Sequence, residues 1–103
     1  MYSHTVLLSL GHAADTTFFS KLWQFESAVR TSCAGVVVYR FSTNEATSRK
    51  GFGHVLFSTF ESRAAFLAYD RSALHCEMKD FLRPYVDDLV VADGDVSPID
   101  AAR

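Results

Sequence analysis

The sequence predicts an α+β fold in which helices cover one face of an antiparallel sheet. Two kinds of periodicity support this prediction. Alternating or β-branched stretches, which are typical of strands, occupy residues 2–10, 36–42, 52–60 and 87–93. Apolar residues recur at helical spacing in residues 15–30 and in a second region, residues 62–83. The order along the chain is therefore strand, helix, strand, strand, helical region, strand.

The first strand is predicted over residues 2–10, which alternate between two faces. His4, Val6 and Leu8 share one face, because successive side chains of a strand point to opposite sides. We assign this face to the helix side of the sheet. His4 is therefore expected to point toward the interior.

The first helix is predicted over residues 15–30, with Asp15 or Thr16 as its N-cap. Its apolar residues recur three or four positions apart and form one stripe: Phe18, Leu22, Phe25 and Val29. Phe19 and Trp23 widen this stripe. Trp23 is a candidate to line a ligand pocket, although an aromatic stripe of this kind is more often plain core.

The strand predicted over residues 52–60 is unusual because both of its faces are largely apolar. One face carries Phe52, His54, Leu56, Ser58 and Phe60, and the other carries Gly53, Val55, Phe57 and Thr59. A sheet that helices cover on one side requires only one apolar face. The second apolar face predicts burial against another sheet, most simply in a homodimer.

The second helical region is predicted to be two helices that meet at a bend. Ser62 and Ser72 are both suitable N-cap residues, so each begins a helix of its own. On one unbroken helix Tyr69 and His75 would point about 240° apart. The bend allows both side chains to face one cavity.

These elements together predict the ferredoxin-like arrangement β-α-β-β-α-β, with helices packed on one face of a four-stranded antiparallel sheet. A chain of 103 residues holds one domain and can bury a single core without disulfide bonds. We assign residues 1–94 to this domain and residues 95–103 to a polar C-terminal tail.

Composition excludes several classes of partner. The net charge of −2 and the scattered basic residues argue against nucleic acid, which requires a basic stripe. The apolar run 6–10 lacks a basic flank and is far shorter than the ~20 residues of a membrane span, so we expect neither a signal peptide nor a membrane segment. Cys33 and Cys76 form no CxxC pair, which predicts reduced thiols in a cytoplasmic protein.

Tyr69 and His75 are the candidate catalytic residues. An imidazole has an ordinary pKa of about 6.5 and can take a proton at neutral pH. A neighbouring tyrosine hydroxyl could donate a hydrogen bond to a developing enolate. The alternative is a helix histidine whose ring is satisfied by a backbone carbonyl or by water.

His4 and His54 are candidate ligand-binding residues, because alternation places both on the helix side of the sheet. A lone histidine on an apolar face is nevertheless more often a core residue. Inward histidines could also hold Zn²⁺ or Fe²⁺, but the chain has no HExxH motif and no i, i+4 histidine pair. We therefore predict that the protein holds no metal.

Three stretches together resemble the stress-responsive A/B barrel (Dabb) family: HTVLLSL near the start, GFGHVLFSTFES in the middle and YDRSALHCEMKDFLRPYVDDLVVAD at the end. The shared features are an early strand His, a strand ending in Phe-Glu-Ser, a Tyr followed six residues later by a His, and a closing Asp-hydrophobic-Asp strand. Members of this family are dimeric α+β barrels. The resemblance therefore implies that two copies of the predicted sheet pair into such a barrel.

The same family includes a cofactor-free plant polyketide cyclase, in which a His and a Tyr promote an aldol ring closure between sheet and helices. The resemblance implies these catalytic roles for His75 and Tyr69. It gives His4 and His54 the places of the first-strand and third-strand histidines. It also implies that no cofactor is required.

The chain departs from the family pattern in three ways, one of which is a shorter first loop. Residues 72–75, Ser-Ala-Leu-His, stand where the family often has His-Pro-x-His, and Leu22 takes the place of the cyclase's first-helix Tyr. Leu22 could line the cavity, but it could not hydrogen-bond a substrate. These differences imply another ligand, or a cavity without catalysis.

Three function classes follow from the sequence. The leading hypothesis is a homodimeric barrel that binds a small, largely apolar or aromatic molecule without a cofactor. The enzyme alternative is a cofactor-independent cyclase, lyase or isomerase that uses Tyr69 and His75. The third class is a structural, stress-protective dimer with a filled core, and a haem-binding barrel is a more distant option.

Overall fold

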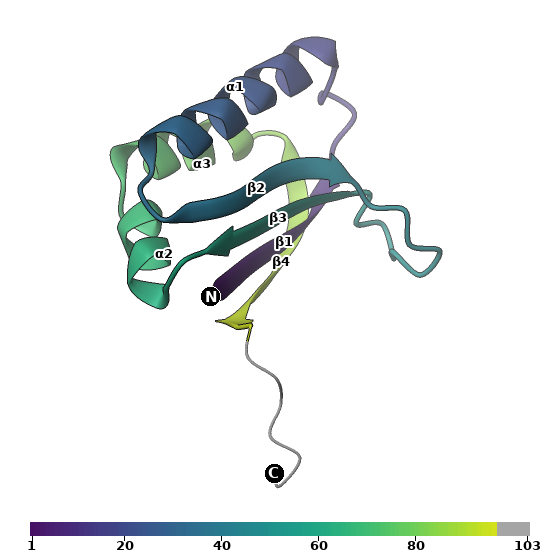
Figure 1. The fold of residues 1–103 in the computed structure, drawn as a ribbon. Helices are drawn as coiled ribbons and strands as arrows, with labels where there is room; N and C mark the ends of the chain where they lie inside the picture. Colours follow the sequence, from purple (N-terminus) through teal and green to yellow (C-terminus); the bar gives the residue numbers. More distant parts are fainter. Residues whose placement is uncertain (97–103) are drawn as a thin grey trace, which may run out of the picture.

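The computed structural model describes residues 1–96 and contains one four-stranded antiparallel sheet with three helices on one face (Figure 1). The strand order is β2-β3-β1-β4, which confirms the predicted ferredoxin-like arrangement. The elements in chain order are β1 (Tyr2–Leu10), α1 (Thr16–Ser32), β2 (Val36–Thr43), β3 (His54–Phe60), α2 (Arg63–Asp70), α3 (Ala73–Leu82) and β4 (Val86–Asp95).

The long helix α1 begins where its N-cap satisfies the first free backbone amides. The Asp15 carboxylate accepts a hydrogen bond from the Phe18 backbone N–H at 3.0 Å, which is typical of a helix N-cap. The predicted apolar stripe is buried: Phe18, Leu22, Phe25 and Val29. Burial of this stripe against the sheet supplies most of the stability of such a helix.

The predicted bend between α2 and α3 is confirmed. The Ser62 hydroxyl accepts from the Ala65 backbone N–H, and the Ser72 hydroxyl accepts from the His75 backbone N–H, both at 3.1 Å. Ser72 therefore caps a new helix two residues after α2 ends. The helix axis changes direction between α2 and α3, as the two serine caps predict (Figure 1).

Several element boundaries differ from the sequence prediction by one or two residues, and the differences in β3 and β4 change which residues form the sheet. Strand β3 begins at His54, because Phe52 closes a tight turn by donating its N–H to the Arg49 carbonyl at 2.9 Å. Lys50 and Gly51 at the centre of that turn both have positive φ, of 51° and 85°. Strand β4 extends to Asp95 rather than ending at residue 93, so residues 94 and 95 belong to the sheet. Residues 97–103 of the predicted tail lie outside the described residues.

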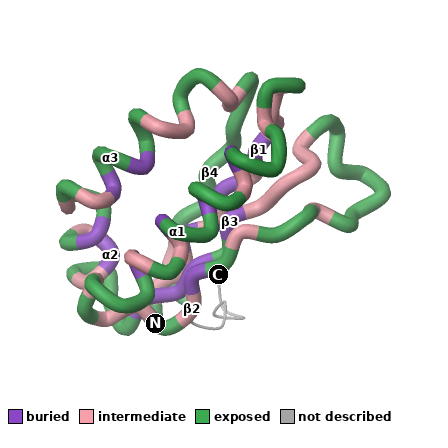
Figure 2. The backbone as a smooth tube through the Cα atoms, turned by 90° about the horizontal axis from the view of Figure 1, so that it is seen from above, coloured by how far each residue is buried: buried purple, intermediate pink, exposed green. Residues whose placement is uncertain are grey.

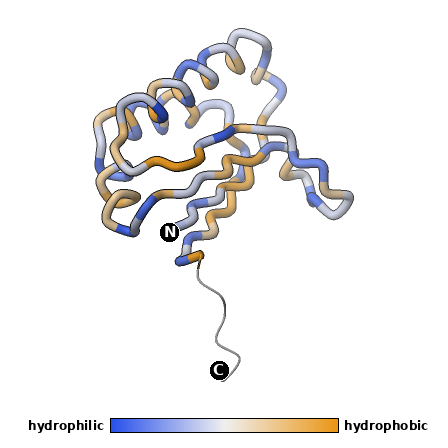
Figure 3. Tube along the Cα trace, in the orientation of Figure 1, coloured by the Kyte–Doolittle hydropathy of each residue, from blue (hydrophilic) through white to orange (hydrophobic). Residues whose placement is uncertain are grey.

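The core lies between the sheet and the helices. Figure 2 shows buried segments on β1 and β3 and on the helices, and Tyr39 and Phe60 in the strands are fully buried. Apolar residues also gather along the strands themselves (Figure 3). Strand β4 differs from its neighbours, because nearly all of its residues are exposed. The helices therefore leave the β4 side of the sheet open.

Within residues 1–96, no helix combines the length and the apolar character that a bilayer crossing requires.

Candidate functional site

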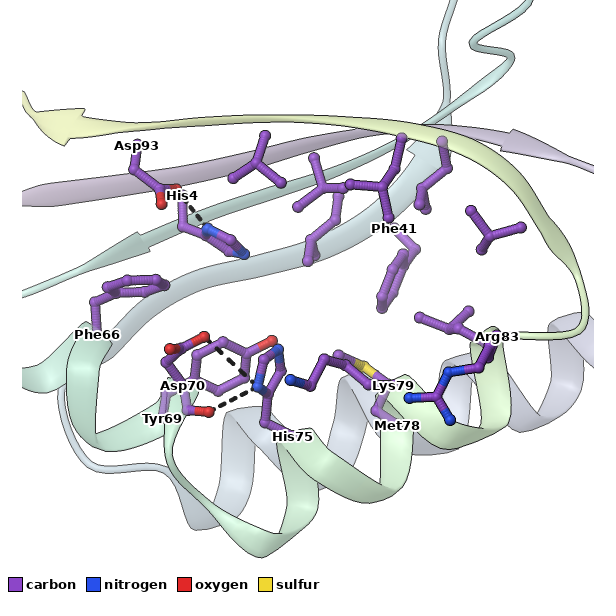
Figure 4. A pocket seen from close by; sticks show the side chains of 17 residues that line it. His4, Phe41, Phe66, Tyr69, Asp70, His75, Met78, Lys79, Arg83 and Asp93 are labelled. Atoms are coloured by element: carbon purple, nitrogen blue, oxygen red, sulfur yellow. Dashed lines mark hydrogen bonds and ion pairs between the residues drawn. The ribbon is translucent and has the colours of Figure 1, made fainter.

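A cavity of about 550 Å³ lies between the sheet and the α2–α3 pair, below the uncovered strand β4 (Figure 4). Its walls are mainly apolar and include Val6, Leu8, Leu56, Phe66, Met78 and Val91. Its polar side chains are His4, Asp93, Tyr69, Asp70, His75, Lys79 and Arg83. A cavity of this size, in which mainly apolar walls carry a set of polar side chains, is typical of small-molecule sites.

The two candidate catalytic residues meet in this cavity. The ring centroids of Tyr69 and His75 lie 4.7 Å apart, and both residues are buried. The bend at Arg71 brings them together, since it turns α3 back toward the end of α2. The juxtaposition expected from the sequence is thus present in the structure.

The hydrogen bonds of His75 define which of its ring nitrogens carries the proton. Its Nδ1–H donates to the Asp70 backbone carbonyl at 2.8 Å, and the Asp70 carboxylate lies 3.6 Å away. A carbonyl only accepts, so the neutral ring carries its proton on Nδ1. Nε2 is then an acceptor, as a general base requires.

Burial lowers the pKa of His75 below its ordinary value, because it penalises the imidazolium. The nearby charges of Lys79 and His4 lower it further, while the carbonyl and carboxylate of Asp70 act in the opposite direction. The balance keeps His75 neutral at pH 7. A neutral imidazole is the form that can accept a proton.

This lowered pKa predicts a pH-dependent stability. The unfolded chain takes up a proton at His75 near pH ~6.5, whereas the folded chain does so only at a lower pH. The contribution of neutral His75 is therefore complete above this range and is lost as the pH falls below it. Denaturant unfolding between pH 5 and pH 8 should show a shallower loss of stability in His75→Gln than in the wild type. The same dependence of stability on pH in both proteins would contradict the lowered pKa of His75. His12→Gln is the control, because it removes one imidazole from an exposed loop.

His4 faces the same cavity from β1 and is held by a carboxylate. Its Nδ1–H donates to Asp93 Oδ1 at 2.5 Å, so Nε2 is left as the acceptor in the neutral ring. The His4 ring also contacts Phe66, with centroids 4.8 Å apart. Asp93 was absent from the candidates that the sequence offers. It lies opposite His4 in the β1–β4 register, which only the strand order reveals.

Tyr39 is a second residue that sequence reasoning missed. Its hydroxyl lies 2.7 Å from the Tyr69 hydroxyl and can donate to the Met78 thioether at 3.4 Å. Burial raises the pKa of both tyrosines, so both phenols stay protonated. When Tyr39 donates to the Tyr69 oxygen, the Tyr69 proton is free for a ligand in the cavity.

The other predicted binding residues lie elsewhere. His54, Leu22 and Trp23 line a second cavity of about 350 Å³, beside α1. His54 shares the helix-side face with His4, as expected, but His54 pairs with Leu8 whereas His4 pairs with Ser58. Four residues along a strand separate the two histidines by about 13 Å. Leu22 is buried core, and Trp23 is 58 % exposed at the rim.

Within residues 1–96, no three His, Cys, Asp or Glu side chains converge in a group that could hold a metal ion. The expectation of a metal-free protein stays a prediction. Cys33 and Cys76 are free thiols, and burial raises the pKa of Cys33.

Solved structures similar to this chain share its fold at low sequence identity. Hydroxynitrile lyase from Passiflora edulis is 18 % identical, with a TM-score of 0.81 and 93 % of each chain covered. A dimeric ferredoxin-like protein from Jannaschia sp. CCS1 is 19 % identical, with a TM-score of 0.80 and coverage of 92 % of this chain and 98 % of that one. A Dabb family protein from Mesorhizobium loti is 17 % identical, with a TM-score of 0.76 and coverage of 94 % and 97 %.

At this identity the structural likeness supports the fold alone. No curated protein matches the sequence. The family comparison is decisive, because the stress responsive A/B barrel domain matches residues 3–96, nearly the whole chain. The resemblance noted in the sequence is thereby confirmed: this chain belongs to the stress-responsive A/B barrel (Dabb) domain family.

Proposed function

We propose that this protein is a homodimer that binds a small, largely apolar molecule in the cavity between the sheet and α2–α3. The observation that carries the proposal is an open cavity of about 550 Å³ in which apolar walls surround two imidazoles. A purely structural dimer has no need of such a space, because the apolar walls of an open cavity stay in contact with water instead of being buried. The open cavity therefore supports a binding function over a structural one.

The outer face of the sheet supports the homodimer. Leu7 pairs with Val55 on one side and with Val90 on the other, so three apolar side chains form a row across the strands. Phe57 and Val90 are 45 % and 46 % exposed. A contiguous apolar patch of this kind is typical of an interface, and several structural neighbours are dimeric.

A second candidate is a cofactor-independent lyase that uses the same cavity. It is favoured by the matching arrangement of the two histidines, since each has an oxygen acceptor at Nδ1 and therefore an unprotonated Nε2. One structural neighbour is a hydroxynitrile lyase. In that reaction class a base takes the hydroxyl proton of a cyanohydrin, the carbonyl forms as the C–C bond breaks, and the cyanide leaves and takes up a proton.

The binding function is tested by closing the cavity. Val91 lines it and is 47 % exposed, so Val91→Trp should fill the opening without disturbing the core. Titration with 2-naphthol, a neutral aromatic probe, should show binding to the wild type and a loss of at least about tenfold in affinity in the variant. Val37→Trp, a matched change at an exposed valine that lines neither cavity, should bind as the wild type does. Equal affinity in all three proteins would place the probe outside this cavity.

A further inference from the structure

One face of α3 and its C-cap residue carry three nitrogen-bearing side chains that all line the cavity. His75, Lys79 and Arg83 lie four residues apart, so they follow one another along a single face of the helix. Figure 4 shows His75 and Lys79 projecting from α3 into the cavity and Arg83 beside the end of the helix. Neutral His75 lies at the inner end of this row, Lys79 follows it, and Arg83 lies at the outer end.

The two cations are not neutralised by strong ion pairs. Among residues 1–96, no carboxylate lies within 4.0 Å of the Lys79 ammonium group. Arg83 pairs with Asp80 at 3.0 Å, but both side chains are more than 70 % exposed, and exposed pairs of this kind contribute little. Both cations are therefore available to a ligand.

The opposite wall of the cavity is apolar near these cations. Leu89 and Val91 of β4 line it and are 48 % and 47 % exposed. The two acidic residues of the cavity are engaged by the histidines: Asp93 holds His4 and Asp70 holds His75. Lys79 lies close enough to His75 to lower its pKa, so its charge is felt inside the cavity. An anion is therefore repelled beside Asp70 and Asp93 and attracted beside Lys79 and Arg83.

We propose that the ligand of this cavity is an apolar or aromatic molecule that carries a carboxylate. The carboxylate lies at Lys79 and Arg83, the apolar body lies on Leu89 and Val91, and the uncharged end reaches the two histidines. This inference rests on the proposed binding function and specifies its ligand class. The C-terminal end of a helix itself disfavours anions, so the selectivity depends on these two side chains.

The test compares ligands that share a phenethyl group and differ in the polar group at its end. The probes are 3-phenylpropanoate, 3-phenylpropanamide and phenethyl phosphate, each titrated by calorimetry at pH 7.5 in low salt. The acid is expected to bind the wild type about tenfold more tightly than the amide, because a charge-assisted contact is stronger than a neutral one. In Lys79→Gln the preference should fall to about threefold or less through weaker binding of the acid alone. Lys50→Gln removes the same charge from a distant exposed loop and should preserve the preference.

The possible outcomes separate this inference from the binding function. Equal affinity of acid and amide in the wild type, or an unchanged preference in Lys79→Gln, would overturn the carboxylate assignment and leave the cavity as a neutral binding site. Tighter binding of the phosphate than of the acid would also overturn it. Failure of all three probes and of 2-naphthol to bind the wild type would overturn the binding function and this inference together.

Discussion

Val55→Asp is expected to dissociate the homodimer or to prevent folding. Val55 lies on the outer face of β3, paired with Leu7 of the central strand, at one end of the apolar row that we assign to the interface. An unpaired carboxylate buried there would cost several kcal/mol, which is comparable with the stability of a small domain. Sedimentation at low micromolar concentration should give twice the 11.5 kDa chain mass for the wild type and a single chain mass, or no soluble protein, for the variant.

Thr47→Asp provides the control, because it adds the same charge at an exposed loop position and should leave the dimer intact. Two results would contradict the account. A stable wild-type monomer would rule out the barrel. An unchanged mass and stability in Val55→Asp would show that the outer face of the sheet is not the interface.

His75→Ala is expected to have the largest effect on chemistry. If the cavity acts as a lyase, this change removes the general base and should lower the turnover of mandelonitrile by about 10²–10⁴, after subtraction of the uncatalysed rate. The affinity for 2-naphthol should fall by less than about tenfold, since one neutral hydrogen bond contributes only ~0.5–1.5 kcal/mol. Tyr69→Phe should lower turnover as well, because it removes the hydrogen-bond donor that we assign to the cavity.

Cys76→Ala is the matched control for His75→Ala, because Cys76 is the next residue of α3, is exposed and does not line the cavity. It should retain full turnover and affinity. If the wild type binds 2-naphthol but does not cleave mandelonitrile faster than the uncatalysed rate, this lyase reaction is excluded and the binding function remains. If the wild type, His75→Ala and Tyr69→Phe bind the ligand equally well and none shows turnover, neither His75 nor Tyr69 belongs to a working site.

The parts of the site that depend on local signals were accessible from the sequence. The caps at Ser62 and Ser72 act within three residues of themselves, so they predicted the bend that joins Tyr69 to His75. The alternation of β1 similarly predicted that His4 points inward. In each case the nearest neighbours in sequence determine the geometry.

The partners of these residues depend on long-range order, and the sequence pattern does not contain it. Asp93 reaches His4 across 89 residues, through a register between β1 and β4 that no local signal sets. Tyr39 lies after an irregularity in the β2–β3 register between Val36 and Val38, where alternation no longer indicates which face a side chain takes. The separation of His54 from His4 likewise follows from register alone.

The position of a bound ligand on the sheet tests the central claim most directly. Adjacent residues of three strands point to opposite faces, which gives three matched pairs of methyl groups: Leu8 with Leu7, Leu56 with Val55, and Val91 with Val90. Methyl-labelled protein saturated with 2-naphthol should show intermolecular nuclear Overhauser effects to Leu8, Leu56 and Val91. The same spectrum should show none to Leu7, Val55 and Val90. Contacts confined to Leu7, Val55 and Val90 would place the ligand on the outer face and contradict a binding cavity between the sheet and α2–α3.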